Sequence, residues 1–162
     1  MDNYEIIVVS NDDREYIHQC LQIIKKNEKN TKLDMFGQID VLEMSKYIIC
    51  AVENNRVIGF VSLMENILQP KDIFISQIAI LTEYQNNNIS ERLINYLKQH
   101  SLEYDKITTN IPQNQYKTIR FYQKLGFEKT ESIFDGYKLE IDTKEIVNNN
   151  AIYYTDLDDY FE

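Results

Sequence analysis

Residues 73–81, IFISQIAIL, constrain the fold of this chain more than any other stretch. Apolar side chains occur at both alternating sets of positions, so a β-strand made from this segment is apolar on both faces. Such a strand belongs in the middle of a sheet that other layers cover on each side. A polar stretch follows at once, and apolar residues recur at helical spacing from Ile89. The segment therefore predicts a central strand that leads through a loop into a helix.

A β-hairpin is expected just before this strand. Two apolar runs flank Asn54-Asn55, and asparagine readily takes the positive φ angles that tight hairpin turns require. We expect the second arm to run from Arg56 to about Leu68. The segment QPKD then turns the chain into the central strand.

The other segments alternate between strand-like and helix-like patterns. We expect a strand over 4–10, a helix opening at Ser10, Asn11 or Asp12, a weak helix over 32–44, a strand over 105–111 stopped by Pro112, a helix over 115–125 closed by Gly126, and a final hairpin turning at Asp135-Gly136. The order β-αα-ββ-β-α-β-α-ββ predicts a single mixed α/β domain of three layers. This domain spans residues 1–143, and an acidic, tyrosine-rich tail spans residues 144–162.

Composition limits the classes of function. The formal net charge of −9 argues against nucleic acid as the main partner, because phosphate binding needs a basic face. No apolar run approaches the length of a membrane span, and the N-terminus has no pattern of a signal peptide. We expect a cytoplasmic protein with no membrane partner.

The two cysteines do not form a pattern typical of a site. Cys20 and Cys50 lie far apart in the sequence, with no Cys or His near either one at ligand spacing. We therefore expect neither a zinc site nor a disulfide framework. Both are interpreted as small buried apolar residues.

The loop after the central strand, QNNNIS, has two interpretations. A strand that ends in a loop and opens a helix gathers free backbone N–H groups at the positive end of the helix dipole, which suits a phosphate. Glycine is usual in such loops, but asparagine also tolerates the left-handed conformation. In the second interpretation Asn88 is only the N-cap of the helix and pairs with Glu91 as a capping box. The loop alone favours the second.

A later segment, residues 115–127 (QYKTIRFYQKLGF), changes this balance. Together with residues 80–90 (ILTEYQNNNIS), it resembles the GCN5-related N-acetyltransferase (GNAT) superfamily, whose patterns read like V-x-P-E-Y-R-x-x-G-x-G/A and N-x-x-A-x-x-F-Y-x-K-L-G-F. The resemblance spans at least residues 46–133. Both loop glycines of the family are replaced, by Asn88 and Ser90, and Ser76 and Gln77 stand where the family often has an acidic residue.

The resemblance implies a fold and a cofactor. The fold is a mixed, mostly antiparallel sheet with helices on both faces, in which the fourth and fifth strands are parallel and splay apart. Acetyl-CoA would lie in that cleft, its pantetheine arm beside the fourth strand and its pyrophosphate on the loop amides. The implied cofactor-binding residues are Ile78, Ile80, Leu81, Gln85, Asn86, Asn87, Asn88, Ile89, Ser90, Asn114 and Gln115. No metal is expected.

The resemblance also assigns one catalytic residue. Tyr122 matches the family tyrosine that protonates the departing CoA thiolate, although its helical spacing from Ile119 is equally typical of a core residue. No firm candidate for the general base emerges. Glu65 and Glu83 are considered, but each is typical of a solvated carboxylate. His18 and His100 are interpreted as surface residues.

Two functions follow. The first is an N-acetyltransferase that moves the acetyl group from acetyl-CoA to a primary amine of a small molecule or peptide by direct attack. The alternative is a degenerate member of the same fold that binds CoA weakly or not at all and serves as an interaction or regulatory module. The acceptor cannot be read from the sequence, although an acidic chain suits a cationic amine. The tail over residues 144–162 and a homodimer stay open questions.

Overall fold

The described strands form one sheet in the order β1-β2-β3-β4-β5-β7-β6. The computed structural model describes residues 3–27, 42–85 and 87–144. The chain divides into two compact units, and strand β4 runs from one into the other. The first unit comprises residues 1–65 and 75–97, and the second comprises residues 66–74 and 98–162.

The first unit is built on an antiparallel sheet. Its elements are β1 (Glu5–Val9), α1 (Arg14–Asn27), β2 (Tyr47–Glu53), β3 (Arg56–Glu65), the later part of β4 (Asp72–Ile80), the short 3₁₀ helix η1 (Thr82–Tyr84) and most of α3 (Ile89–His100). Strand β2 pairs antiparallel with both β1 and β3. Asn54 and Asn55 form the β2–β3 turn with φ angles of 51° and 63°. The predicted asparagine hairpin is therefore confirmed, although its second arm ends at Glu65 and not at Leu68.

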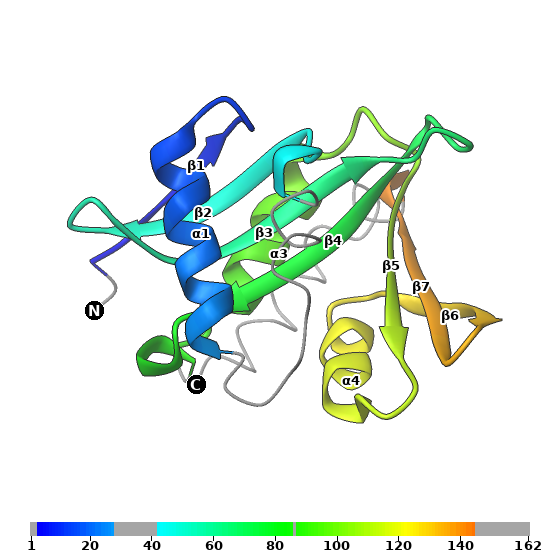
Figure 1. The fold of residues 1–162 in the computed structure, drawn as a ribbon. Coiled ribbons are helices and arrows are strands. Elements are labelled where there is room, and N and C mark those ends of the chain that lie inside the picture. Colours follow the sequence, from blue (N-terminus) through cyan, green and yellow to red (C-terminus); the bar gives the residue numbers. More distant parts are fainter. Residues whose placement is uncertain (1–2, 28–41, 86, 145–162) are drawn as a thin grey trace. The chain divides into compact units, whose positions relative to one another are not determined.

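Helices α1 and α3 cover opposite faces of this sheet, α1 in front of it and α3 behind it in Figure 1. The buried side of α1 consists of Ile17, Cys20, Ile23 and Ile24. On α3 the fully buried apolar residues are Ile89, Leu93, Ile94 and Leu97. Gly59 allows the α3 side to pack closely, because a Cβ there would lie 2.5 Å from Ile80 Cδ1 and 3.3 Å from Ile89 Cγ2. The predicted layers are confirmed in this unit.

The cysteines belong to the core of the first unit, as predicted. Cys20 on α1 and Cys50 on β2 are free thiols with no exposed surface. A hydrogen bond with the Cys50 side chain and burial raise the pKa of Cys20 well above its ordinary value. The Cys20 thiol therefore stays protonated and unreactive at neutral pH.

The second unit joins parallel and antiparallel strands. Its elements are the first part of β4, β5 (Lys106–Pro112), α4 (Tyr116–Lys124), β6 (Glu128–Ile133) and β7 (Gly136–Asp142). Strand β4 pairs parallel with β5 over Asp72–Phe74, and β7 lies between β5 and β6. Gly126 follows α4 with a φ of 99°, as expected of a left-handed helix end, and Asp135 makes the last turn with a φ of 62°.

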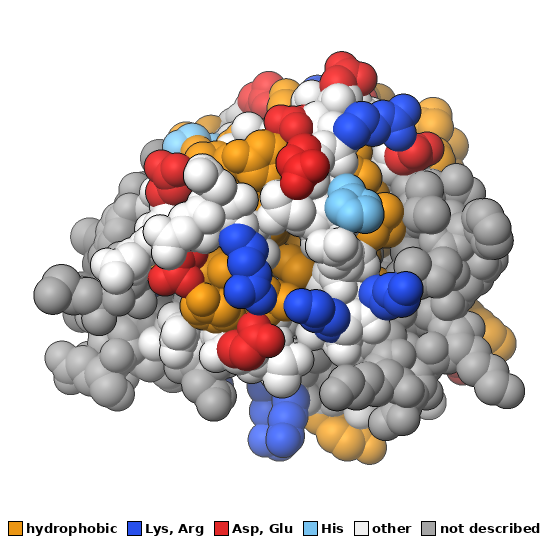
Figure 2. Space-filling view, turned by 60° about the vertical axis from the view of Figure 1, so that its left-hand side comes forward, with side chains coloured by type: hydrophobic (Ala, Val, Ile, Leu, Met, Phe, Trp, Pro, Cys, Tyr) orange, Lys and Arg blue, Asp and Glu red, His pale blue; other side chains and the backbone are white. Residues whose placement is uncertain are grey.

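The order and types of these elements confirm the predicted mixed α/β fold with parallel β4 and β5. The weak helix expected over residues 32–44 lies outside the described residues, except that Leu42 and Glu43 are helical. Most of the acidic tail, residues 145–162, also lies outside them. No helix within the described ranges is long and apolar enough to cross a membrane. On the face shown in Figure 2, basic and acidic side chains are interspersed with apolar ones.

Candidate functional site

The carboxyl end of β4 opens into a cavity in the first unit. Its volume is about 430 Å³, and its walls come from α1, β4, the following loop and the start of α3. The lining residues are Ile24, Asn27, Gln77, Ile78, Ala79, Ile80, Gln85 and Ser90. Four of the predicted cofactor-binding residues therefore meet at one cavity: Ile78, Ile80, Gln85 and Ser90.

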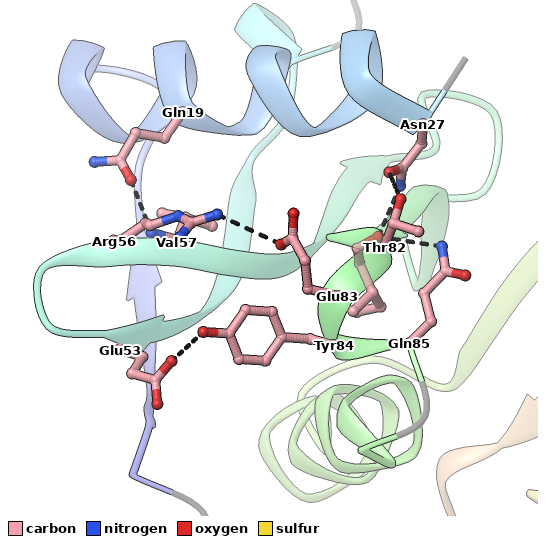
Figure 3. Close-up of polar contacts among 10 residues, drawn as sticks. Gln19, Asn27, Glu53, Arg56, Val57, Thr82, Glu83, Tyr84 and Gln85 are labelled. Atoms are coloured by element: carbon pink, nitrogen blue, oxygen red, sulfur yellow. Dashed lines mark hydrogen bonds and ion pairs between the residues drawn. The ribbon is translucent and has the colours of Figure 1, made fainter. Parts of the chain in front are cut away.

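The backbone carbonyl of Ile80, in the cavity wall, accepts two hydrogen bonds from side chains. Asn27 Nδ2 donates a hydrogen bond to it at 2.7 Å, and Gln85 Nε2 donates a second at 3.4 Å. Thr82 Oγ1 donates in turn to Asn27 Oδ1 at 3.2 Å. Figure 3 shows these side chains converging between the last turn of α1 and the end of β4. Sequence reasoning did not identify Asn27, because its partner lies 53 residues away.

The loop after β4 begins as a tight turn. The amide of Gln85 donates to Thr82 O at 3.4 Å, and the amide of Asn87 donates to Tyr84 O at 3.1 Å. Asn86 lies outside the described residues. Two of the predicted loop amides are thus hydrogen-bonded within the turn itself.

Asn88 is where the turn becomes a helix. Its carbonyl accepts the Arg92 amide at 3.3 Å, which is the first hydrogen bond of α3. Its φ is 58°, a left-handed conformation rather than the extended one typical of an N-cap. The amides of residues 88–91 are the four that a helix start leaves without intrahelical acceptors. The residue therefore begins α3 and also bends the chain as a glycine would.

Two other predicted residues pack behind the cavity rather than line it. Leu81 and Ile89 are both buried. The Leu81 amide donates to Ile58 O at 2.8 Å, which continues the pairing of β4 with β3. These residues hold the wall against the rest of the first unit.

Three different elements hold the η1 turn through its side chains (Figure 3). Thr82 bonds to Asn27 of α1, Glu83 forms an ion pair of 3.5 Å with Arg56 of β3, and Tyr84 donates a hydrogen bond to Glu53 of β2. The bond to Glu53 is the main cause of a raised pKa of Tyr84. The segment that leads into the loop is thus fixed at each of its three residues.

The carboxylates considered as a general base lie at the surface. Glu83 is more than half exposed and pairs with Arg56, and Glu65 is more than half exposed and pairs with Lys46. Both are solvated carboxylates, as expected. His18 and His100 are exposed on their helices, which confirms that expectation too.

A serine pair occupies the part of β4 where an acidic residue was considered. Ser76 Oγ donates to Ser62 O at 3.1 Å, and the two hydroxyl oxygens are 2.7 Å apart. Ser62 therefore donates to Ser76, and both hydroxyls are satisfied. Gln77 lines the cavity, and no carboxylate lies among the cavity-wall residues that the structure describes.

Tyr122 is a residue of α4 and lies in the core of the second unit. Its side chain is only 1% exposed, and its ring makes edge-to-face contacts with Phe121 and Phe127 at 5.1 Å. Burial raises the pKa of the hydroxyl, and a hydrogen bond with the Thr109 side chain opposes this shift. The hydroxyl therefore keeps its proton at neutral pH.

The start of α4 carries the last two predicted residues. Asn114 and Gln115 are exposed. Gln115 is the N-cap of α4 through its carbonyl, which accepts the Ile119 amide at 3.1 Å. Its side chain makes no capping bond and is available for other contacts.

A buried lysine supports the other end of α4. Lys98 is 3% exposed, and its Nζ donates to Leu125 O at 2.7 Å. Burial lowers the pKa of Lys98 to about 8. The sequence does indicate that Lys98 is buried, since it follows Ile94 by one helical turn on the apolar side of α3.

Comparison with known proteins agrees with this arrangement. The profile of the acetyltransferase (GNAT) family matches residues 14–127, so the chain belongs to the GNAT acetyltransferase family. A search of curated protein sequences finds no significant match.

Solved structures show the same fold at low sequence identity. A GNAT-family protein from Desulfovibrio desulfuricans has a TM-score of 0.75 at 9% identity, over 86% of this chain and 99% of that one. The ribosomal-protein-S18-alanine N-acetyltransferase of Escherichia coli has a TM-score of 0.68 at 12% identity, over 86% and 94%. An aminoglycoside acetyltransferase from an uncultured soil metagenomic sample, in complex with sisomicin, has a TM-score of 0.64 at 17% identity, over 82% and 93%.

Proposed function

We propose that this protein transfers the acetyl group of acetyl-CoA to a primary amine of a small molecule or peptide. The observation that carries the proposal is the cavity at the end of β4, where Ile78, Ile80, Gln85 and Ser90 meet beside the start of α3. Family membership makes an acetyl donor the expected occupant. The volume of about 430 Å³ lies within the range of pockets that hold small molecules.

The start of α3 suits the pyrophosphate of the donor. The amides of residues 88–91 lack intrahelical acceptors, and the helix dipole adds positive charge at the same place. The left-handed Asn88 produces the sharp bend for which the family uses glycine. In this proposal the pyrophosphate binds at the amides after the turn. Asn114 and Gln115 remain proposed cofactor-binding residues on the family pattern alone.

The chemistry needs few protein groups. The neutral amine attacks the acetyl carbonyl, the carbon–sulfur bond breaks, and CoA leaves as a thiolate that takes up a proton. Tyr122 is proposed as the source of that proton, since its hydroxyl is protonated at neutral pH. The proton of the attacking amine is proposed to pass to water, because none of the described residues that line the cavity is titratable.

The same lining supports a second candidate, a degenerate GNAT-fold protein that binds CoA weakly or not at all and acts as an interaction or regulatory module. Ser76 and Gln77 occupy the strand positions where the family often has an acidic residue, and Ser76 is hydrogen-bonded to Ser62. In this case the chemistry is lost, and the binding of CoA is weakened or lost as well.

Calorimetric titration with acetyl-CoA, dephospho-CoA and pantetheine tests the donor site. Micromolar binding of acetyl-CoA that is largely lost with pantetheine supports a pyrophosphate site at the start of α3. No binding at millimolar acetyl-CoA refutes the enzyme and favours the interaction or regulatory module. Release of the CoA thiol in the presence of polyamines, aminoglycosides or lysine peptides then separates the enzyme from the binding module.

The acceptor panel is chosen for its chemistry. The net charge of −9 favours cationic amines. Among the structural relatives, one acts on the alanine of a ribosomal protein and another is an aminoglycoside acetyltransferase, so peptides and small amines both belong in the screen.

A further inference from the structure

We propose that Asn27 is a positioning residue for the pantetheine arm of acetyl-CoA, an inference that rests on the proposed function. Asn27 is the last residue of α1 and lies in the cavity wall. Its side chain joins the end of that helix to the Ile80 carbonyl of β4 and to Thr82 of η1. No other residue in the cavity wall bonds to both β4 and η1 through its side chain in the described structure.

The hydrogen bonds fix which way the Asn27 amide faces. Thr82 Oγ1 donates to Asn27 Oδ1 at 3.2 Å, and this leaves Asn27 Nδ2 pointing to Ile80 O at 2.7 Å. A flipped amide would place its NH₂ group against the Thr82 hydroxyl and its oxygen against the Ile80 carbonyl, which loses the short hydrogen bond and sets two acceptors together. The Ile80 carbonyl, which can only accept, therefore sets the amide orientation, and the Thr82 hydroxyl holds the amide in that orientation by donating to Oδ1.

The Ile80 carbonyl has one strong and one weak partner. Its bond from Asn27 is 2.7 Å, whereas its bond from Gln85 is 3.4 Å, near the limit of a hydrogen bond. An amide N–H of the pantetheine arm can replace the Gln85 donor at little cost. The bond from Asn27 stays in place, so the carbonyl is already oriented when the arm arrives and less order is lost on binding.

Binding measurements on two ligands separate this role from a general structural one. Acetyl-CoA contains the arm, whereas adenosine 3′,5′-bisphosphate carries the adenosine and two of the three phosphates without it. Asn27→Ala removes both side-chain bonds, so we expect acetyl-CoA to bind about fivefold more weakly, the effect of about one hydrogen bond. The affinity for adenosine 3′,5′-bisphosphate should not change.

Variants of Thr82 provide a second test with conservative rescue. Thr82→Val removes the hydroxyl that holds the amide in its orientation, and we expect it to weaken acetyl-CoA binding in the same direction as Asn27→Ala. Thr82→Ser retains the hydroxyl and should bind like the unmodified protein. Asn11→Ala is the matched control, because it also removes a 2.7 Å bond from an asparagine side chain to a backbone carbonyl, that of Glu43, at a residue outside the cavity wall.

The outcomes are distinct. If the unmodified protein does not bind acetyl-CoA, the proposed function fails and the role of Asn27 falls with it. If the unmodified protein binds and Asn27→Ala binds equally well, the role of Asn27 is wrong while the function stands. Equal weakening of both ligands, or the same loss in Thr82→Ser as in Thr82→Val, would mean that Asn27 only supports the fold.

Discussion

The buried lysine of α3 should make stability depend on pH in an unusual direction. Lys98 is 3% exposed, and burial lowers its pKa from 10.5 to about 8. Between these values the unfolded chain holds a proton on Lys98 that the folded chain does not. Stability therefore rises as the pH increases through this window, because the unfolded state binds more protons.

The size of the effect follows from the two pKa values. The full depression corresponds to about 3 kcal/mol of free energy between the two protonation states. Between about pH 7 and about pH 10 the Lys98 contribution to the free energy of unfolding should rise by about 2 kcal/mol. The rest appears only above the pKa of the unfolded chain.

Urea unfolding of the unmodified protein and of Lys98→Met, at several pH values across this range, isolates the contribution. Tyrosines and surface lysines titrate alike in both proteins, so they cancel in the difference between the two free energies of unfolding. We expect this difference to shift by about 2 kcal/mol in favour of the unmodified protein as the pH rises. Parallel curves would show that the Lys98 amine keeps an ordinary pKa and that water reaches it.

Three further changes test the fold and the site. Gly136→Ala should destabilise the protein by more than about 2 kcal/mol in urea unfolding. The new Cβ would lie 2.3 Å from Ile111 O and 3.0 Å from Pro112 Cα, which are backbone atoms that cannot rotate away. A loss of less than half of that free energy would mean that β5 and β7 shift easily. Tyr122→Phe should lower turnover by about a hundredfold if the hydroxyl is the acid, while calorimetry shows little change in acetyl-CoA affinity; unchanged turnover would remove that role. Asn88→Asp should weaken acetyl-CoA binding by about tenfold, because it places a negative charge beside the pyrophosphate. It should not lower the thermal midpoint of unfolding, because a carboxylate is favourable at the start of a helix. Equal affinity for acetyl-CoA would mean that the loop serves only to begin α3.

Local chemistry explains why most of the fold could be predicted from the sequence. The hairpin turn needs two residues with positive φ, and Asn54-Asn55 supply them. The apolar pattern of residues 73–81 identified β4 as a central strand, and Gly126 identified the end of α4. Each of these signals lies within a few residues of the structure that it specifies.

The candidate site was harder to predict because its contacts are long-range. The positions along β4 and the loop were found through the family pattern, whereas Asn27 has no such pattern and meets Ile80 only in the folded chain. Lys98 did carry a signal in its helical position, but a lysine on an apolar stripe is usually a surface residue whose stem lies along the protein. Its contact with Leu125 O depends on how α4 ends, which periodicity does not describe.

The side-chain bonds of η1 help to offset the cost of placing asparagine, rather than glycine, in the loop. A glycine at the helix start reaches a left-handed angle without steric cost, whereas Asn88 reaches its φ of 58° at some cost that the surroundings must offset. The three partners of η1, one each from α1, β2 and β3, hold the preceding turn in place. These bonds restrict the conformations open to the loop, so less order has to be imposed on it. A loop rich in asparagine is therefore compatible with an ordered anion site here, because long-range side-chain bonds supply the order.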